Sequence, residues 1–109
     1  MIPDYSFIPD LSARLPEIPA DSILSSTFYS DGQVKAILFR FAAGQELSEH
    51  TASKPAILRI LSGAAKLTLG KAAFDAREGA WAHMPANLPH SLLAKTPVVM
   101  LLLLLNAGG

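Results

Sequence analysis

Short apolar segments separated by turn residues fill the last two thirds of the chain. From Val34 to Phe41 apolar side chains alternate, so that Ile37, Phe39 and Phe41 share one face and Arg40 lies on the other. This alternation predicts a half-buried strand. Further apolar segments lie at 56–62, 65–69, 72–76, 80–84, 91–94 and 98–105, with glycine or proline in the breaks between them. Segments this short, with no helical period between them, indicate an antiparallel sandwich or barrel.

The first 33 residues have a different pattern. Prolines interrupt them repeatedly, and no period is sustained. We expect residues 1–33 to form an N-terminal arm with short strands, one of them at 23–29, as part of the same domain as a barrel at 34–109.

The run from Val98 to Leu105 is apolar at every position. It is too short for a membrane-spanning helix, which needs about 20 residues. As a strand it extends over about 26 Å, and both of its faces need cover. In a domain this small, another sheet or another subunit supplies the second covering layer. Since a net charge near zero also favours association, we expect a homodimer.

Composition excludes several classes of function. The 109 residues include nine Lys or Arg, nine Asp or Glu and no Cys. Balanced charge without a basic run argues against nucleic acid or a membrane surface as the partner. The lack of cysteine excludes a thiol nucleophile and a thiolate metal site. It also agrees with a cytoplasmic location, as does an N-terminal segment that does not resemble a secretory signal.

Three histidines, His50, His83 and His90, are the strongest candidates for chemistry. Imidazole is the commonest ligand of transition metals in proteins, and a metal site needs several converging ligands. We expect His50 and His90 each to lie where a strand begins after a turn, and antiparallel pairing can bring two such positions together. Surface or interface positions are the alternative for His83 and are expected for Arg59.

The spacing of residues around His50 resembles the first motif of the cupin superfamily. Gly44 is followed by five residues, His50, one residue, Ala52, three residues, Ala56, six residues and Gly63. The cupin motif has this spacing, with a second histidine in place of Ala52 and a glutamate in place of Ala56.

The second cupin motif is matched at residues 79–94. Gly79, Pro85 and His90 stand at its positions, whereas Asn87 replaces a turn glycine and Ala94 replaces the terminal asparagine. Asparagine is tolerated at such a turn because it adopts left-handed backbone geometry more readily than most residues.

The resemblance implies an all-β fold, a cupin-type antiparallel β-barrel of the jelly-roll or double-stranded β-helix kind, with a small-molecule or metal site in the barrel mouth. It implies His50 and His90 as ligands of a divalent Mn, Fe, Ni or Zn ion. The third ligand stays open, with His83, Glu46 and Glu49 as candidates. Metal-dependent cupins include dioxygenases, isomerases and decarboxylases.

The rest of the expected pocket is apolar or small. Extra volume should open beside His50, because alanine stands where the family has larger ligands; the alternative is that side chains fill the barrel. The expected lining, in which Met84 is an alternative to Trp81, is Phe39, Phe41, Ala52, Ala56, Leu58, Ile60, Trp81, Asn87 and Leu92. Two functions fit this pocket: a metal-dependent enzyme acting on a small molecule, and a metal-free binding or sensor module without catalysis.

Overall fold

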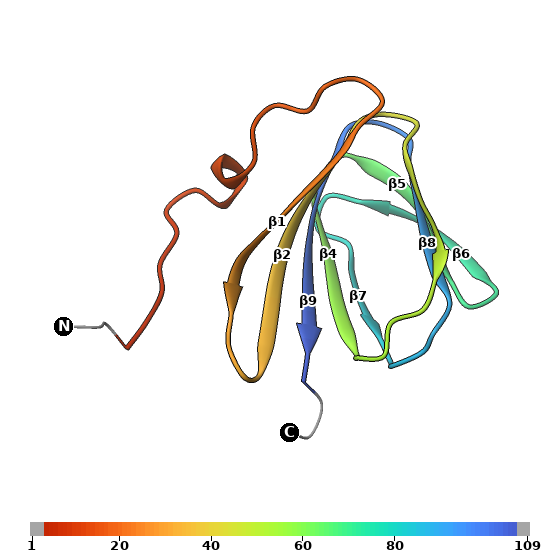
Figure 1. The fold of residues 1–109 in the computed structure, drawn as a ribbon. Coiled ribbons are helices and arrows are strands. Elements are labelled where there is room, and N and C mark those ends of the chain that lie inside the picture. The colour runs from red at the N-terminus through yellow and green to blue at the C-terminus, as the bar shows by residue number, and fades with distance from the viewer. Residues whose placement is uncertain (1–3, 107–109) are drawn as a thin grey trace.

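The computed structural model describes residues 4–106, which form a short 3-10 helix followed by nine strands (Figure 1). The helix η1 covers Leu11–Arg14. The strands are β1 (Ile23–Ser30), β2 (Val34–Phe41), β3 (Glu46–His50), β4 (Ala56–Ser62), β5 (Ala64–Leu69), β6 (Ala72–Arg77), β7 (Trp81–Met84), β8 (His90–Ala94) and β9 (Val98–Leu105). The predicted all-β class is therefore confirmed, and the bounds of β2, β4 and β9 are those that the pattern predicts.

Two antiparallel sheets face each other and enclose the core. Sheet A has the strand order β1-β2-β9-β4-β7, and sheet B has the order β3-β8-β5-β6. Apart from the consecutive pairs β1–β2 and β5–β6, neighbouring strands in each sheet come from distant parts of the sequence, as in a jelly roll. The described part of the chain contains no helix with the length and hydropathy that a membrane-spanning segment needs.

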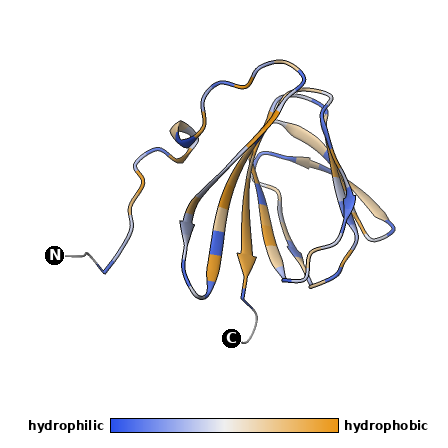
Figure 2. Ribbon diagram, in the orientation of Figure 1, coloured by the Kyte–Doolittle hydropathy of each residue, from blue (hydrophilic) through white to orange (hydrophobic). Residues whose placement is uncertain are grey.

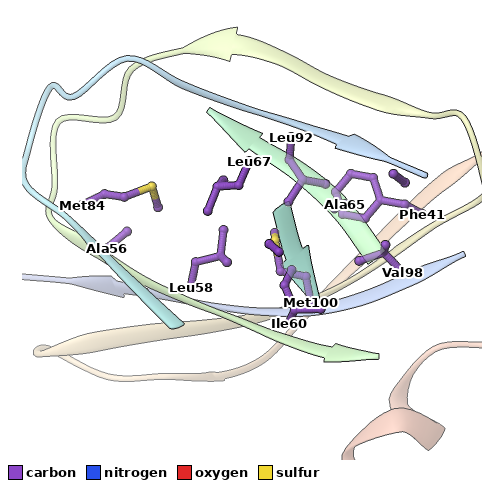
Figure 3. Close-up of a cluster of buried hydrophobic side chains, with 12 residues drawn as sticks. Phe41, Ala56, Leu58, Ile60, Ala65, Leu67, Met84, Leu92, Val98 and Met100 are labelled. Carbon is purple, nitrogen blue, oxygen red and sulfur yellow. The ribbon is translucent and has the colours of Figure 1, made fainter. Parts of the chain in front are cut away.

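The buried side chains between the sheets are almost all aliphatic (Figure 3). Figure 2 shows the corresponding hydrophobic colouring along the strands of sheet A. Phe41 and Ile60 are completely buried, and Met100 and Leu92 are nearly so. Burial of each such side chain stabilises the fold by about 1.5–3 kcal/mol, so this cluster is the main source of its stability.

Strand β2 is covered on both faces, so the prediction of a half-buried strand was wrong. Phe41 faces the core, yet Ala36 and Leu38 on the opposite face are only 5% and 0% exposed. The N-terminal arm covers that face: η1 contacts β2, and Nη2 of Arg40 donates a hydrogen bond to the carbonyl oxygen of Ser12 over 2.9 Å. This cover could not be predicted from the alternation within β2, because it comes from the N-terminal arm, whose sequence has no regular hydrophobic period.

Strand β3 lies between the apolar segments 34–41 and 56–62, in a stretch that is mostly polar. Of its five residues only Leu47 is apolar, but β3 pairs antiparallel with β8 at the edge of sheet B. An edge strand with one solvent-facing side needs few apolar residues.

Gly63 is required in the β4–β5 turn. Its φ is +90°, and a Cβ atom at this position would collide with the carbonyl oxygen of Pro97. Glycine alone avoids both the backbone strain and the collision. The glycine at the end of the first motif therefore has a physical reason in this chain.

Candidate functional site

His50 and His90 lie side by side at the edge of sheet B. They are direct cross-strand partners on β3 and β8, their ring centroids are 4.1 Å apart, and their planes are inclined at 60°. His90 begins β8 as predicted, but His50 ends β3, so the prediction that both begin a strand was wrong for His50. Because β3 and β8 are antiparallel, the last residue of one strand lies opposite the first residue of the other.

A β-bulge places His50 opposite His90. Leu47 pairs with Leu92, which faces the core, and strict alternation would then put Glu49 on the inner face and His50 outside. Three residue steps lead from Leu47 to His50, but only two lead from Leu92 to His90. The extra residue in β3 restores the inner face to His50.

Both imidazole rings make the same local hydrogen bond. Nδ1 of His50 lies 2.9 Å from the carbonyl oxygen of Ser48, and Nδ1 of His90 lies 2.9 Å from that of Leu88. A carbonyl oxygen can only accept, so Nδ1 carries the proton in each neutral ring and Nε2 keeps its lone pair. Histidines that bind metals commonly have this arrangement, because the second hydrogen bond fixes the ring and its tautomer.

His50 and His90 line a small pocket of about 110 Å³ inside the barrel. Its lining, apart from the two imidazoles, is hydrophobic: Phe39, Leu47, Leu58, Leu67, Met84, Leu92, Met100 and Leu102. The sequence singled out Phe39, Leu58 and Leu92, and gave Met84 as an alternative. It missed Leu47, Leu67, Met100 and Leu102. Inward positions on β5 and β9 follow from alternation, but Leu47 has no such signal.

Three of the residues expected in the lining belong to the core instead. Phe41, Ala56 and Ile60 are at most 4% exposed and pack in the buried cluster, without lining the pocket. Ala52 and Asn87 lie in the loops that precede β4 and β8, and the backbone N–H of Asn87 donates to the carbonyl oxygen of Ala52 over 2.7 Å. That bond ties the two motif segments together, and Asn87 has the left-handed φ of +67° expected of a glycine substitute.

Trp81 and His83 belong to a second pocket. They line a groove of about 440 Å³ between the sheet edges β6 and β7, together with Phe74 and Ala82. Leu58 and Leu67 line this groove as well as the histidine pocket.

Within residues 4–106, no third metal ligand joins the two imidazoles. Glu46 and Glu49 are exposed, and neither lines the histidine pocket. Over residues 4–106, no group of three His, Cys, Asp or Glu side chains could hold a metal ion. The arrangement therefore offers two nitrogen lone pairs, held by their rings' hydrogen bonds, beside an apolar pocket whose lining has no carboxylate.

No protein-family model matches the chain, and no curated protein matches it. Among solved structures, a conserved protein of unknown function from Streptococcus pyogenes is 29% identical with a TM-score of 0.83, covering 97% of this chain and 92% of its own. A cupin superfamily protein from Desulfitobacterium hafniense is 26% identical with a TM-score of 0.81, covering 95% and 94%. The lyase DddQ from Ruegeria pomeroyi, which acts on DMSP, is 20% identical with a TM-score of 0.73, covering 81% and 49%, and is similar in fold alone. The two-sheet barrel, the motif spacing around His50 and His90, and these neighbours together show that the chain belongs to the cupin superfamily.

Proposed function

We propose that this cupin binds a divalent transition metal weakly through Nε2 of His50 and Nε2 of His90, and that a small molecule in the barrel completes the coordination. The observation that carries the proposal is the pairing of the two rings at 4.1 Å, with both Nδ1 atoms committed to backbone carbonyls. The Nε2 atoms on the adjacent strands β3 and β8 therefore each keep a lone pair for a metal, and neither ring has to change its tautomer to bind one.

The donor atoms of the pocket favour a late first-row metal. No carboxylate lines the pocket, and two thioether side chains, Met84 and Met100, lie in its wall. Hard ions such as Mn²⁺ prefer oxygen ligands, whereas Zn, Ni and Cu accept imidazole, and thioethers suit softer ions. From the expected set of Mn, Fe, Ni and Zn, this environment favours Ni and Zn.

The number of ligands limits the affinity. Stable zinc sites have three or four protein ligands, and this site supplies two. A small molecule that chelates the metal would raise the affinity, and the metal and the molecule would then bind cooperatively. A pocket of about 110 Å³ accommodates a compact ligand whose apolar part faces leucine and methionine side chains.

Catalysis would rest on the metal and the imidazoles. A bound divalent metal would supply Lewis acidity at the barrel mouth. The chain's own contribution would be to hold the metal through the two imidazoles, to orient the ligand, and to exclude water with the aliphatic wall. Some neighbours of the same fold are enzymes by name, such as the DMSP lyase, at 20% identity.

The second candidate function is binding of a small molecule without metal. It is favoured by Ala52 and Ala56, which stand where the superfamily motif has two of its metal ligands. In that case the two Nε2 atoms accept hydrogen bonds from the ligand's polar group. The predicted cytoplasmic location applies to both functions.

Equilibrium dialysis against Zn²⁺ and Ni²⁺ tests the proposal. The wild-type chain is compared with His50→Ala and His90→Ala, with His83→Ala as the matched control because His83 lies in the other groove. We expect His50→Ala and His90→Ala each to bind the metal at least about tenfold more weakly than wild type, because each variant removes a ligand. The control His83→Ala should bind the metal as wild type does. Equal uptake by all four proteins, or none by wild type with or without a chelating small molecule, would overturn metal binding. It would leave the metal-free function.

A further inference from the structure

Two exposed aromatic side chains line the same groove, one from each sheet. Phe74 on β6 and Trp81 on β7 are 52% and 63% exposed, and both line the groove of about 440 Å³ between these edge strands. The strands β6 and β7 follow each other along the chain and are outermost in sheet B and sheet A (Figure 1). Large aromatic side chains that stay exposed on both walls of one groove are typical of a binding site, because single apolar residues scattered over a surface do not gather in this way.

Phe74 lies on the inner face of sheet B but is not covered. It is the cross-strand partner of Leu67, which belongs to the buried cluster, so both side chains leave the same face. Leu67 is 4% exposed, whereas Phe74 keeps half of its surface accessible. Three alanines, Ala76, Ala80 and Ala82, form part of the lining, and their methyl groups leave room that larger side chains would fill. The resulting volume is within the range of small-molecule pockets, about 300–1,000 Å³.

The side chains of the groove suit a ligand that brings a hydrogen-bond acceptor. Trp81 and His83 are two residues apart on β7, so they leave the same face of the strand, and both line the groove. Neither side chain makes a hydrogen bond to another group in the described part of the chain. The indole Nε1 can only donate, and a neutral imidazole has one N–H in either tautomer. Asp75, the carboxylate of the lining, already accepts a hydrogen bond from Nζ of Lys95 over 2.6 Å.

The strands around the groove carry an excess of positive charge, although the whole chain is neutral. Residues 54–84 include β4 to β7 and hold five basic and two acidic residues: Lys54, Arg59, Lys66, Lys71 and Arg77, against Asp75 and Glu78. Arg59 is exposed and is the direct cross-strand partner of Trp81. The hydrogen bond and charge of Lys95, and to a smaller extent the charges of Arg77 and Lys66, hold the pKa of Asp75 below its ordinary value. An anionic group at the groove therefore meets complementary charge, whereas a cation, which aromatic rings alone would attract, meets repulsion.

We propose that this groove is a second small-molecule site, which takes a flat aromatic carboxylate. The ring of the ligand lies between Phe74 and Trp81, over alanine and leucine side chains, with offset or edge-to-face contacts to both aromatic residues. Its carboxylate lies on the β7 side, where His83 donates a hydrogen bond and Arg59 supplies positive charge. The site is separate from the proposed metal site, because His50 and His90 line the other pocket.

Calorimetric titration with naphthoate in the presence of EDTA tests the site without any metal. We expect wild type to bind naphthoate more tightly than naphthylmethanol, which has the same ring without the charge, and more tightly than naphthylmethylammonium. Added salt should reduce the preference for the anion, because the charges around the groove lie at the surface. The proposal is overturned if naphthoate does not bind, or if the alcohol or the ammonium compound binds as tightly.

Substitutions test whether naphthoate lies in the groove. Phe74→Ala and His83→Ala should each bind naphthoate at least about tenfold more weakly than wild type, since the first removes a wall of the site and the second its donor. Phe7→Ala is the matched control, because Phe7 is an exposed aromatic residue outside the groove, and it should bind naphthoate as wild type does. Unchanged affinity in either groove variant overturns the proposal. An equal loss in His50→Ala does so too, because it would put naphthoate in the histidine pocket. Circular dichroism checks that each variant is folded.

The single tryptophan of the chain reports directly on the groove. Because Trp81 is the one Trp of the sequence, its indole N–H gives a single NMR resonance, which naphthoate should shift. A resonance that stays in place during the titration contradicts the site. If the resonance instead moves with protein concentration in the absence of naphthoate, a second copy of the chain covers the groove, and the proposal is wrong. Since the titration excludes metal and the metal dialysis uses His83→Ala as its control, the failure of one proposal can be told from the failure of the other.

Discussion

Leu58 on β4 and Leu67 on β5 separate the histidine pocket inside the barrel from the groove between the edge strands β6 and β7. Both side chains line the histidine pocket and also the groove between β6 and β7. They are 3% and 4% exposed and come from opposite sheets (Figure 3). The reach of a ligand from the histidines toward Trp81 is therefore limited by two aliphatic side chains.

Shortening Leu67, one of the two leucines between the pockets, should lower the stability of the fold and enlarge the histidine pocket. We expect Leu67→Ala to lower the free energy of unfolding by about 2–5 kcal/mol, because a buried leucine is lost and a cavity remains. Leu69→Ala is the control: Leu69 lines only the groove and is half-buried, so its loss should be smaller. Urea unfolding gives both values. If the free energy of unfolding falls no further for Leu67→Ala than for Leu69→Ala, the buried role given to Leu67 between the two pockets is wrong.

The hydrogen bonds of the two rings predict the tautomer of each histidine. In the neutral protein both rings should carry their proton on Nδ1, since Ser48 and Leu88 offer only carbonyl oxygens there. Nitrogen-15 NMR of the imidazoles distinguishes the two tautomers, and addition of Zn²⁺ should shift the Nε2 resonances of His50 and His90 and leave those of His83 in place. Protonated Nε2 in either ring of the metal-free protein contradicts the prediction.

The positions of several strands and the pairing of His50 with His90 could be predicted from the sequence, because each has a signal in the order and spacing of residues along the chain. The bounds of β2, β4 and β9 follow from apolar runs that end at turn residues, and the motif spacing indicates that His50 and His90 converge. What could not be predicted depends on a partner strand or segment. The bulge before His50 exists only relative to β8, and the burial of Leu38 depends on an arm without a period.

The turn between β1 and β2 should make stability depend on pH. Asp31 accepts hydrogen bonds from the hydroxyl of Tyr29 and from the backbone N–H groups of Gln33 and Val34. The bond from Tyr29, followed by the two backbone bonds, lowers the pKa of Asp31 below its ordinary value. A lowered folded pKa stabilises the protein above the unfolded pKa, near 3.9, and this contribution is lost as the pH falls through the folded pKa.

Asp31→Asn tests this linkage. Thermal unfolding between pH 5 and pH 2.5 should show a smaller fall of Tm for Asp31→Asn than for wild type, because the variant has no carboxylate to protonate in the turn. Glu78→Gln, an exposed residue of the β6–β7 turn, is the matched control and should retain the wild-type slope. Parallel curves for wild type and Asp31→Asn would show that the turn does not hold the ionised carboxylate in solution.

Gly63 provides a test of the close contact between the β4–β5 turn and Pro97. Replacement by alanine forces a side chain into positive φ and against a backbone carbonyl, which cannot move as a flexible side chain would. Backbone strain of this kind costs about 1–3 kcal/mol, and the collision adds to it. Gly44→Ala separates the two effects, because Gly44 also has positive φ, +84°, but a Cβ atom there meets nothing within 4 Å. Urea unfolding should therefore rank the variants as Gly63→Ala least stable, Gly44→Ala intermediate, and Gly32→Ala, with open space and no positive φ, nearest to wild type. If Gly63→Ala and Gly44→Ala are equally stable, the approach of Pro97 contributes nothing, and φ alone accounts for glycine at the end of the first motif.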